Sequence, residues 1–159
     1  MTRKLSHVGA DGAARMVDVS AKAETVRTAQ AEGSIRMTMV AFEAIRSHQI
    51  AKGDVLSVAR VAGVMAAKRT ADLIPLCHPL LLDDVQIDLS LDDTLPGIRA
   101  MSQVRCSGRT GVEMEAIVGV TVALVTVYDM AKSVDRGMTI GDISLVAKTG
   151  GRSDRNIPG

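Results

Sequence analysis

The sequence is almost free of aromatic residues, since Phe42 and Tyr128 are the only two and tryptophan is absent. A hydrophobic core must therefore be built from valine, alanine, leucine, isoleucine and methionine. Single-stranded nucleic acids are bound largely by stacking their bases on aromatic side chains, so this composition argues against that function. The formal net charge of +1 also provides no basic field for binding duplex DNA.

Cysteines and long apolar segments are scarce as well. Two cysteines among 159 residues do not make a disulfide framework, which favours reduced thiols and a cytoplasmic location. The N-terminus lacks the apolar core of a signal peptide. The longest apolar run, residues 116–128, is shorter than a membrane-spanning helix and predicts a buried helix. We expect one domain over residues 1–159, not attached to a membrane, with flexible tails at residues 1–15 and 150–159.

Alternation of apolar and polar residues with a period of two predicts four strands. They are expected over residues 25–37, 82–91, 98–107 and 139–147. The second and third strands are expected to form a hairpin, because the turn-forming segment 92–97 joins them. Gly33 predicts a bulge or bend in the first strand, and residues 16–20 predict a short extended piece before it.

Helical spacing of apolar residues predicts three helices, over residues 39–47, 54–69 and 112–134. Asp54 is expected to cap the second helix, and Thr110 and Glu113 match a capping box for the third. The third helix is apolar on nearly every side, so it needs cover from two directions, and we expect a subunit interface to supply the second. The order of elements predicts the α+β class with a ferredoxin-like layout, an antiparallel sheet backed by helices.

Two prolines pin the loop that follows the second predicted helix. Pro75 and Pro79 fix their own φ and push Ile74 and His78 toward extended geometry. A histidine held in this way is a general acid or base, a hydrogen-bond partner of a substrate, or a structural residue. Cys77 is typical of a small buried side chain. No second Cys or His pair lies at ligand spacing, so we do not expect a metal site.

Acidic residues mark both ends of the third predicted helix. Glu113 near its start is explained by the helix dipole alone, whereas Glu115 heads the apolar run and is the stronger functional candidate. Asp129 near the other end opposes the dipole and lies one turn from Lys132, which predicts a surface salt bridge or a proton-transfer group held by a cation. Glu115 and Asp129 lie about 21 Å apart along such a helix. If both act on one substrate, two chains must share the site.

Basic residues near glycines or helix starts are a further group of candidates. Such residues are either ordinary solvated surface or partners of phosphate groups. They are Lys22, Arg27, Lys52, Lys68, Arg69, Lys148 and Arg152. The chain has no glycine-rich phosphate loop of the GxxxxGK[ST] or GxGxxG type, so a nucleotide would not be held in the common ways.

Several segments of the chain resemble, in the same order, the cyclic pyranopterin monophosphate synthase family of molybdenum cofactor biosynthesis. The two most specific segments are Leu73–Leu80 and Thr110–Ala116. The others are residues 16–20, 21–27, 52–55, 66–70, 128–132 and 147–151. Together they cover most of the chain, and all the catalytic motif positions are intact.

The resemblance implies an enzyme, a lyase that converts a cyclised dihydro-GTP intermediate to cyclic pyranopterin monophosphate and releases diphosphate. A radical SAM GTP cyclase would supply that substrate. The resemblance implies no tightly bound cofactor, although Mg²⁺ is compatible with the diphosphate. It also implies a ferredoxin-like fold in a homohexamer, a trimer of dimers with its sites at the dimer interfaces. A non-catalytic carrier of the pterin intermediate is the alternative.

The matching motifs also imply roles for individual residues. Asp129 would be the catalytic acid or base, with Lys52 and Lys132 assisting proton transfer and charge stabilisation. The substrate pocket would be lined by Leu76, Cys77, His78, Glu113, Met114 and Glu115. The triphosphate, or structural acids, would pair with Lys22, Arg27, Lys68, Arg69 and Lys148. The set is chemically consistent, because ring rearrangement needs acids and bases and a departing diphosphate needs cations.

Overall fold

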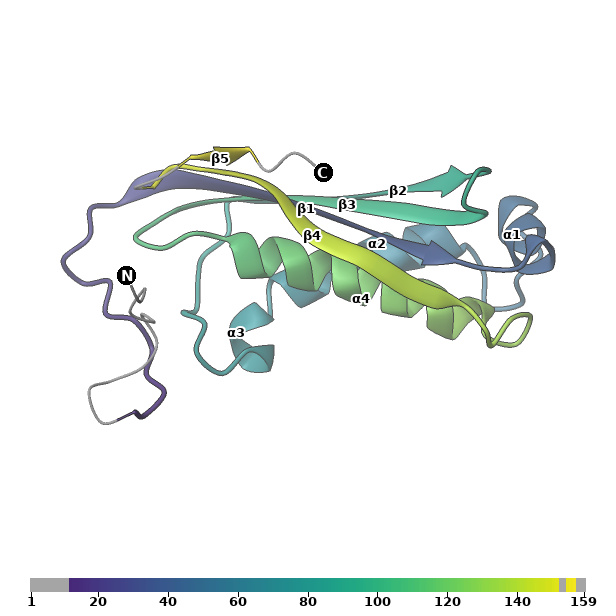
Figure 1. Ribbon diagram of the computed structural model, residues 1–159, viewed down its shortest axis with the longest axis horizontal. Helices are drawn as coiled ribbons and strands as arrows, with labels where there is room; N and C mark the ends of the chain where they lie inside the picture. Colours follow the sequence, from purple (N-terminus) through teal and green to yellow (C-terminus); the bar gives the residue numbers. More distant parts are fainter. Residues whose placement is uncertain (1–11, 152–153, 157–159) are drawn as a thin grey trace.

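A computed structural model of the chain describes residues 12–151 and 154–156. Its centre is an antiparallel sheet with the strand order β2-β3-β1-β4-β5, and α2, α3 and α4 lie on one side of it (Figure 1). The strands are β1 (Thr25–Arg36), β2 (Asp84–Asp92), β3 (Gly97–Gly108), β4 (Thr139–Thr149) and β5 (Arg155–Asn156). The fold is α+β and ferredoxin-like, as predicted. The four predicted strands and the hairpin of β2 with β3 are confirmed.

The three predicted helices also form, with small differences in length. α1 spans Met39–Arg46, α2 spans Val55–Ala67 and α4 spans Glu113–Ala131. Asp54 caps α2 as expected, because its carboxylate accepts a hydrogen bond from the Ser57 amide at 3.1 Å. The sequence pattern missed the short helix α3 (Thr70–Leu73), which directly follows α2.

Small residues on β1 let α4 approach the sheet closely. Ala29 and Ala31 are buried there, and a Cβ on Gly33 would lie only 2.9 Å from the Val120 side chain and 3.0 Å from that of Leu124. Glycine is therefore the residue that fits at this contact. The pairing of β1 with β4 does shift register between Glu32 and Ser34, but the extra residue there belongs to β4, and β1 pairs with β3 in unbroken register through Gly33. The bulge expected in the first strand at Gly33 therefore lies in the neighbouring strand β4.

The second cover of α4 comes from α2 of the same chain, so the expectation that a subunit interface supplies it is wrong. A Cβ on Gly63 of α2 would lie 2.9 Å from the Gly119 carbonyl oxygen of α4. Two glycines at the crossing thus allow the helices to pack backbone to backbone. By length and composition alone α4 could cross a membrane, but 56% of its apolar window is buried inside the protein. It is the core helix that the sequence predicted.

The capping box predicted for α4 does not form. The N-cap position is Val112, and no side chain accepts a hydrogen bond there. Glu113 turns instead toward Lys148 of β4, whose ammonium group lies 2.8 Å from its carboxylate. An ion pair with a residue distant in sequence has replaced the local cap. α4 also ends at Ala131, three residues before the predicted end.

The two chain ends differ in part from the prediction. Residues 1–11, 152–153 and 157–159 of the predicted tails lie outside the described residues. Arg155 and Asn156 were predicted in a tail, yet they form β5, which pairs with β4. Residues 16–20 form no regular strand, although a short extended piece was expected there.

Candidate active site

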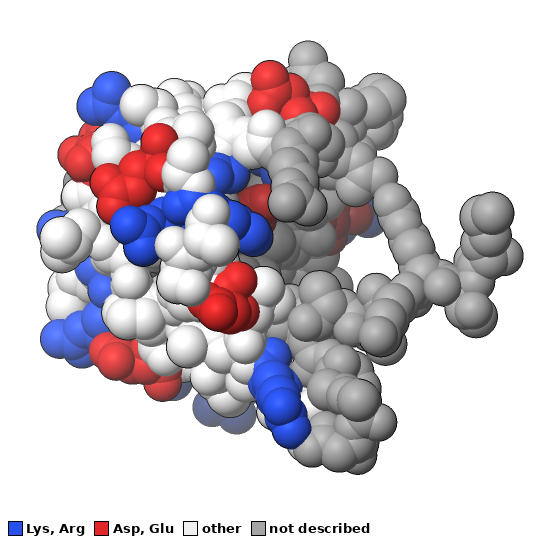
Figure 2. Space-filling view, turned by 90° about the vertical axis from the view of Figure 1, so that its left-hand side faces the viewer, with Lys and Arg blue, Asp and Glu red and all other residues white. Residues whose placement is uncertain are grey.

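A basic pocket of 530 Å³ opens where α4 begins and the sheet ends. Four cationic side chains and one acid line it: Lys22, Arg27, Arg109, Lys148 and Glu113. Figure 2 views this end of the molecule and shows Lys and Arg side chains gathered beside a hollow. The excess of positive charge suits an anionic ligand such as a phosphate chain.

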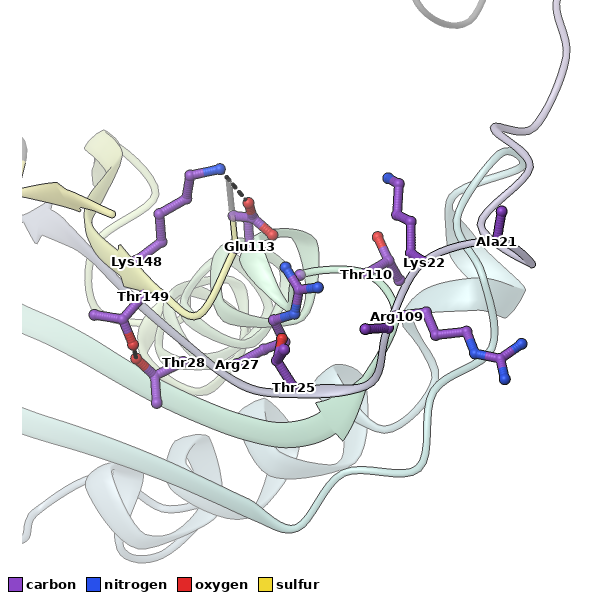
Figure 3. Close-up of a pocket in the computed structure, with 13 residues that line it drawn as sticks. Ala21, Lys22, Thr25, Arg27, Thr28, Arg109, Thr110, Glu113, Lys148 and Thr149 are labelled. Atoms are coloured by element: carbon purple, nitrogen blue, oxygen red, sulfur yellow. Dashed lines mark hydrogen bonds and ion pairs between the residues drawn. The ribbon is translucent and has the colours of Figure 1, made fainter. Parts of the chain in front are cut away.

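Sheet register brings two of these cations together from distant parts of the sequence. Arg27 pairs with Cys106 across β1 and β3, and Lys148 pairs with Ala29 across β1 and β4. Because cross-strand partners share a face and residues alternate along a strand, Arg27 and Lys148 lie on the face that α4 covers. Figure 3 shows both side chains directed toward Glu113, whereas Arg109 points away.

Glu113 holds Lys148 at the wall of the basic pocket. Burial would raise the pKa of Glu113, but the hydrogen bond and charge of Lys148, with the charge of Arg27, lower it overall. The carboxylate is therefore ionised at neutral pH, and it positions a cation. A Cβ on Gly111 would collide with this carboxylate, so the glycine of the Thr110–Ala116 motif leaves the space that Glu113 occupies.

The glycines after Lys148 make room for Arg27. Gly150 has a φ of +83°, and a Cβ on it would collide with the Val26 carbonyl oxygen. A Cβ on Gly151 would lie 2.7 Å from Nη1 of Arg27. The Arg27 side chain is also anchored, because its Nε donates a hydrogen bond to the Gly108 carbonyl oxygen at 3.3 Å. The segment 147–151 therefore shapes the pocket as well as contributing a lysine.

A smaller cavity of 100 Å³ adjoins the start of α4 on the side of α2 and α3, and we call it the Glu115 pocket. Its charged lining residues are Lys68, Arg69, Asp72 and Glu115. Glu115 is 4% exposed and has no ion-pair partner among the described residues. Burial, followed by the charge of Glu113, raises the pKa of Glu115. A buried acid with a raised pKa is suited to donate a proton.

The proline-pinned loop lies close to the Glu115 pocket. Ile74 is extended, with φ −112° and ψ 108°, as Pro75 predicts. Cys77 is half-buried, and its pKa is raised by burial and then by the charge of Glu115. His78 is half-buried near Asp18. Hydrogen bonds from Ser20 lower the pKa of Asp18, and the charge of His78 lowers it further.

The remaining predicted pocket residues, Leu76 and Met114, are half-buried as well. Leu76 belongs to the same loop as Cys77 and His78, and Met114 lies between Glu113 and Glu115 in the first turn of α4. The predicted binding residues thus gather at one end of the molecule, in and around the basic pocket and the Glu115 pocket.

The predicted catalytic residues form a separate Asp129 cluster at the other end of α4. Lys52 Nζ lies 2.7 Å from Asp129 Oδ2, and Lys132 Nζ lies 2.6 Å from Oδ1. Hydrogen bonds from Lys132 and Lys52 lower the pKa of Asp129 to about 2. Lys52 also donates to the Asp129 carbonyl oxygen at 2.9 Å, so it caps a free carbonyl at the helix end. The three side chains border a cavity of 320 Å³.

Within one chain, the Asp129 cluster and the two pockets lie at opposite ends of α4. α4 is continuous from Glu113 to Ala131, so Glu115 and Asp129 are separated by about 21 Å along its axis. In Figure 1 the start of α4 lies at the left end of the molecule and the end of α4 at the right. The separation predicted from the helix length is confirmed within a single chain.

The MoaC family profile matches residues 16–151 of this chain, which include the basic pocket, the Glu115 pocket and the Asp129 cluster. The chain belongs to the MoaC family. A member of this family from Methylobacterium sp. (strain 4-46), named cyclic pyranopterin monophosphate synthase, is 59% identical over 149 residues. The aligned region covers 94% of this chain and 93% of that relative. The family resemblance stated from the motifs is thus confirmed.

Several polar residues that line the cavities of this MoaC protein were not among the predicted site residues. Arg109 and Thr110 line the basic pocket, and Arg136 lines the cavity at the Asp129 cluster. Arg109 immediately precedes the Thr110–Ala116 motif, so its place beside a recognised motif was an available signal. Arg136 lies beyond the end of α4 and had no comparable signal in the sequence.

The side chains that line the basic pocket of this MoaC chain suit an anion better than a metal ion. Among the described residues, no three His, Cys, Asp or Glu side chains gather closely enough to hold a metal. The basic pocket has one carboxylate, and Lys148 already neutralises it. Its lining can bind phosphate groups directly through lysine and arginine.

Proposed function

We propose that the protein is a cyclic pyranopterin monophosphate synthase, which rearranges a cyclised dihydro-GTP intermediate and releases diphosphate in molybdenum cofactor biosynthesis. The observation that carries this proposal is the combination of a cation-lined pocket with a separate carboxylate clamped by two lysines, in a chain of the MoaC family. The name of the 59% identical relative supports the same activity.

The basic pocket would bind the triphosphate part of the substrate. Lys22, Arg27 and Lys148 would donate charge-assisted hydrogen bonds to the phosphate oxygens. Their positive charge would stabilise the negative charge that develops on the departing diphosphate. Lys68 and Arg69, at the Glu115 pocket, would add to this positive electrostatic potential. Such a set of cations needs no tightly bound cofactor, and Mg²⁺ would enter only together with the diphosphate.

The Asp129 cluster would handle proton transfer at the ring system. With a pKa of about 2, Asp129 is a carboxylate at neutral pH and does not serve as an acid while both lysines hold it. The ammonium groups of Lys52 and Lys132 would be the proton donors beside it. Substrate that displaces one lysine would free Asp129 to accept a proton, so the pair of lysines and the carboxylate would act together.

The distance between the two ends of α4 favours a site shared by two chains. We infer that a two-fold axis places the Asp129 cluster of one chain beside the basic pocket and the Glu115 pocket of its partner. A homohexamer built as a trimer of dimers would contain such pairs. The substrate would come from a radical SAM GTP cyclase, and both enzymes would work in the cytoplasm.

Turnover of the cyclised dihydro-GTP intermediate by the purified protein tests this function. An Asp129→Asn variant should bind the intermediate but form product at least 100-fold more slowly, because the proton acceptor is lost. Normal turnover by this variant would remove Asp129 from its role. Stoichiometric binding of the intermediate by the wild-type protein, unchanged after long incubation, would instead favour the carrier function.

Mixing two inactive variants tests the sharing of sites. Chains with Asp129→Ala and chains with Glu115→Ala should regain activity when they are unfolded and refolded together, since one kind of mixed site then holds both intact groups. Each variant refolded alone is the control. Absence of any regain in mixed oligomers would place each complete site within one chain.

A further inference from the structure

The segment of residues 18–24, which we call the Lys22 strap, borders the basic pocket with little packing to hold it in place. Residues 21–23 line that pocket. Every residue from 20 to 26 is exposed, so no buried apolar side chain anchors this part of the chain to the core. The position of such a segment depends on its polar contacts.

Strand register places Arg109 beside the Lys22 strap. The pairing of β1 with β3 ends where Thr25 lies opposite Gly108, so the next residue of each chain segment, Glu24 and Arg109, lie close together. Nε of Arg109 lies 3.6 Å from Oε1 of Glu24, and its Nη1 donates a hydrogen bond to the Ser20 carbonyl oxygen at 3.3 Å. One guanidinium group therefore contacts the strap at two points.

Lys22 lies midway between these two points of contact. The Ser20 amide donates a hydrogen bond to Asp18 Oδ1 at 2.8 Å, and the Lys22 amide donates one to the Val19 carbonyl oxygen at 3.0 Å. These internal turns link the backbone of Lys22 to the part of the strap that Arg109 holds. Among the described residues no acid pairs with the Lys22 ammonium group, which leaves it free for a ligand of the pocket.

Arg109 itself is poorly placed to bind a phosphate chain. Its contacts go to a backbone carbonyl and to the carboxylate of Glu24, which neutralises its charge. Figure 3 shows the Arg109 side chain pointing away from Lys22 and from the pair of Glu113 with Lys148. An arginine that is directed at a neighbouring segment, and not at the cavity, positions that segment.

We propose that Arg109 is a positioning residue that clamps the Lys22 strap and thereby holds Lys22 at the basic pocket, where it meets a phosphate chain. When Arg109 releases the strap, Lys22 loses its fixed place at the pocket. The apparent affinity for a triphosphate then falls with the fraction of chains whose strap is held. The effect of the clamp on an enzyme substrate rests on the function proposed above.

Glu24→Gln separates clamping from simple electrostatics, because the two accounts predict opposite signs. If charge alone mattered, removing an acid beside a cationic pocket would strengthen the binding of an anion. If Glu24 helps Arg109 to hold the strap, the substitution should weaken binding about 2-fold or more. Isothermal titration calorimetry with inorganic triphosphate measures the affinity. Binding equal to that of the wild type, or stronger, would overturn the clamp.

A double-mutant cycle tests whether Arg109 acts through Lys22. Arg109→Gln should weaken triphosphate binding about 3- to 10-fold, because both contacts to the strap are lost. In a Lys22→Met chain the same substitution should change the affinity less than about 2-fold, since the strap then carries no cation. Equal losses in both backgrounds would show that Arg109 binds the phosphates itself. The matched control is Arg99→Gln, an exposed arginine of β3 paired with Asp92, which should leave the affinity unchanged.

Trypsin reports on the strap without any ligand, because Lys22 is its only lysine or arginine. Arg109→Gln and Glu24→Gln should each speed cleavage after Lys22 about 2-fold or more, since a released strap fits the protease more often. Mass spectrometry of the fragments identifies the cleaved bond. Thermal unfolding should stay unchanged, because the strap has no buried side chain from residue 20 onward. Cleavage at the wild-type rate in both variants would overturn the clamp.

Turnover of the cyclised dihydro-GTP intermediate separates this inference from the enzyme assignment. Arg109→Gln should raise KM about 3- to 10-fold with little change in kcat, as expected for loss of ground-state binding. A fall in kcat with KM unchanged would overturn the positioning role and leave the enzyme assignment standing. Wild-type protein that binds triphosphate, and loses that affinity on Arg109→Gln, but never turns over would overturn the enzyme assignment and leave the clamp standing.

Discussion

The two acids in the first turn of α4 should respond in opposite ways to the same substitution. Glu115 is 4% exposed and lacks an ion-pair partner among the described residues, and its pKa is raised by burial. Glu113 is bonded to Lys148 at 2.8 Å, and its pKa is lowered. Glu→Gln removes the charge at either position and keeps the shape. The two substitutions therefore form a matched test of whether an ion-pair partner or burial determines the pKa of each carboxyl group.

Glu115→Gln should stabilise the protein at pH 7. A backbone hydrogen bond partly offsets the burial of the Glu115 carboxyl group, but no opposite charge does. Leaving an ionised carboxylate buried without an opposite charge costs several kcal/mol, and protonating it instead costs about 1.4 kcal/mol for each unit that the pH lies above its pKa. Glutamine removes that cost but needs hydrogen bonds of its own. We expect a net gain of about 1–2 kcal/mol, which corresponds to a rise in Tm of about 2–8 °C for a chain of this size.

Glu113→Gln should destabilise the protein at pH 7, by about 1–2 kcal/mol, because Lys148 loses its charged hydrogen-bond partner in a half-buried site. The two acids also differ in pH dependence. The stability contributed by Glu113, whose pKa is lowered in the folded state, is present above the ordinary value of 4.5 and is lost as the pH falls through the folded value. Glu115, with its raised pKa, is harmless below 4.5 and becomes destabilising as the pH rises.

Thermal unfolding of both variants and the wild type at pH 7 and at pH 4 is the assay, with turnover measured in parallel. Glu115→Gln should be more stable but less active at pH 7, the behaviour of a residue kept for function. Its gain in stability should shrink at pH 4. Destabilisation by Glu115→Gln at pH 7, or the same sign of effect for both variants, would refute the reasoning.

Two further variants probe the wall of the basic pocket. Lys148→Met should raise KM for the triphosphate substrate about 10-fold or more, with a smaller effect on kcat, because a phosphate-binding cation is lost. Steady-state kinetics is the measurement. An effect on kcat alone would show that the lysine serves only proton transfer. Gly150→Ala should lower the free energy of unfolding by about 1–3 kcal/mol in urea titrations, since φ is +83° and a Cβ would meet the Val26 carbonyl oxygen. An unchanged unfolding midpoint for Gly150→Ala would show that the backbone relaxes freely there.

The sequence predicted some local features correctly because their causes lie within a few residues. Asp54 caps α2 through the Ser57 amide three positions away, and Pro75 sets the extended geometry of Ile74 next to it. The capping box at Thr110 and Glu113 was an equally local prediction, and it was wrong. Lys148, 35 residues further along the chain, offers Glu113 a charged partner that the local amide cannot match.

The cover of α4 shows the same limit on a larger scale. An apolar pattern on all sides of a helix predicts that other elements must pack against it from two directions, but it does not identify those elements. Gly63 and Gly119 permit a close crossing, and that crossing brings α2 onto α4 within one chain. The subunit contact expected on α4 is therefore not needed for most of its burial, although Val125 of α4 remains 49% exposed.

By itself, the sequence determined the element types, the motifs of the MoaC family and the distance of about 21 Å between Glu115 and Asp129. These follow from periodicity, from residue identity and from the fixed rise of a helix. Only the tertiary structure decided which charges meet. Arg27 and Lys148 become neighbours through strand register, and packing buries Glu115 away from any opposite charge among the described residues. Asp129 gains Lys52, 77 residues earlier in the chain, through the crossing of α2 with α4, whereas its pairing with Lys132 is local. Since burial and partners control ionisation, the chemistry of each group was decided by the fold.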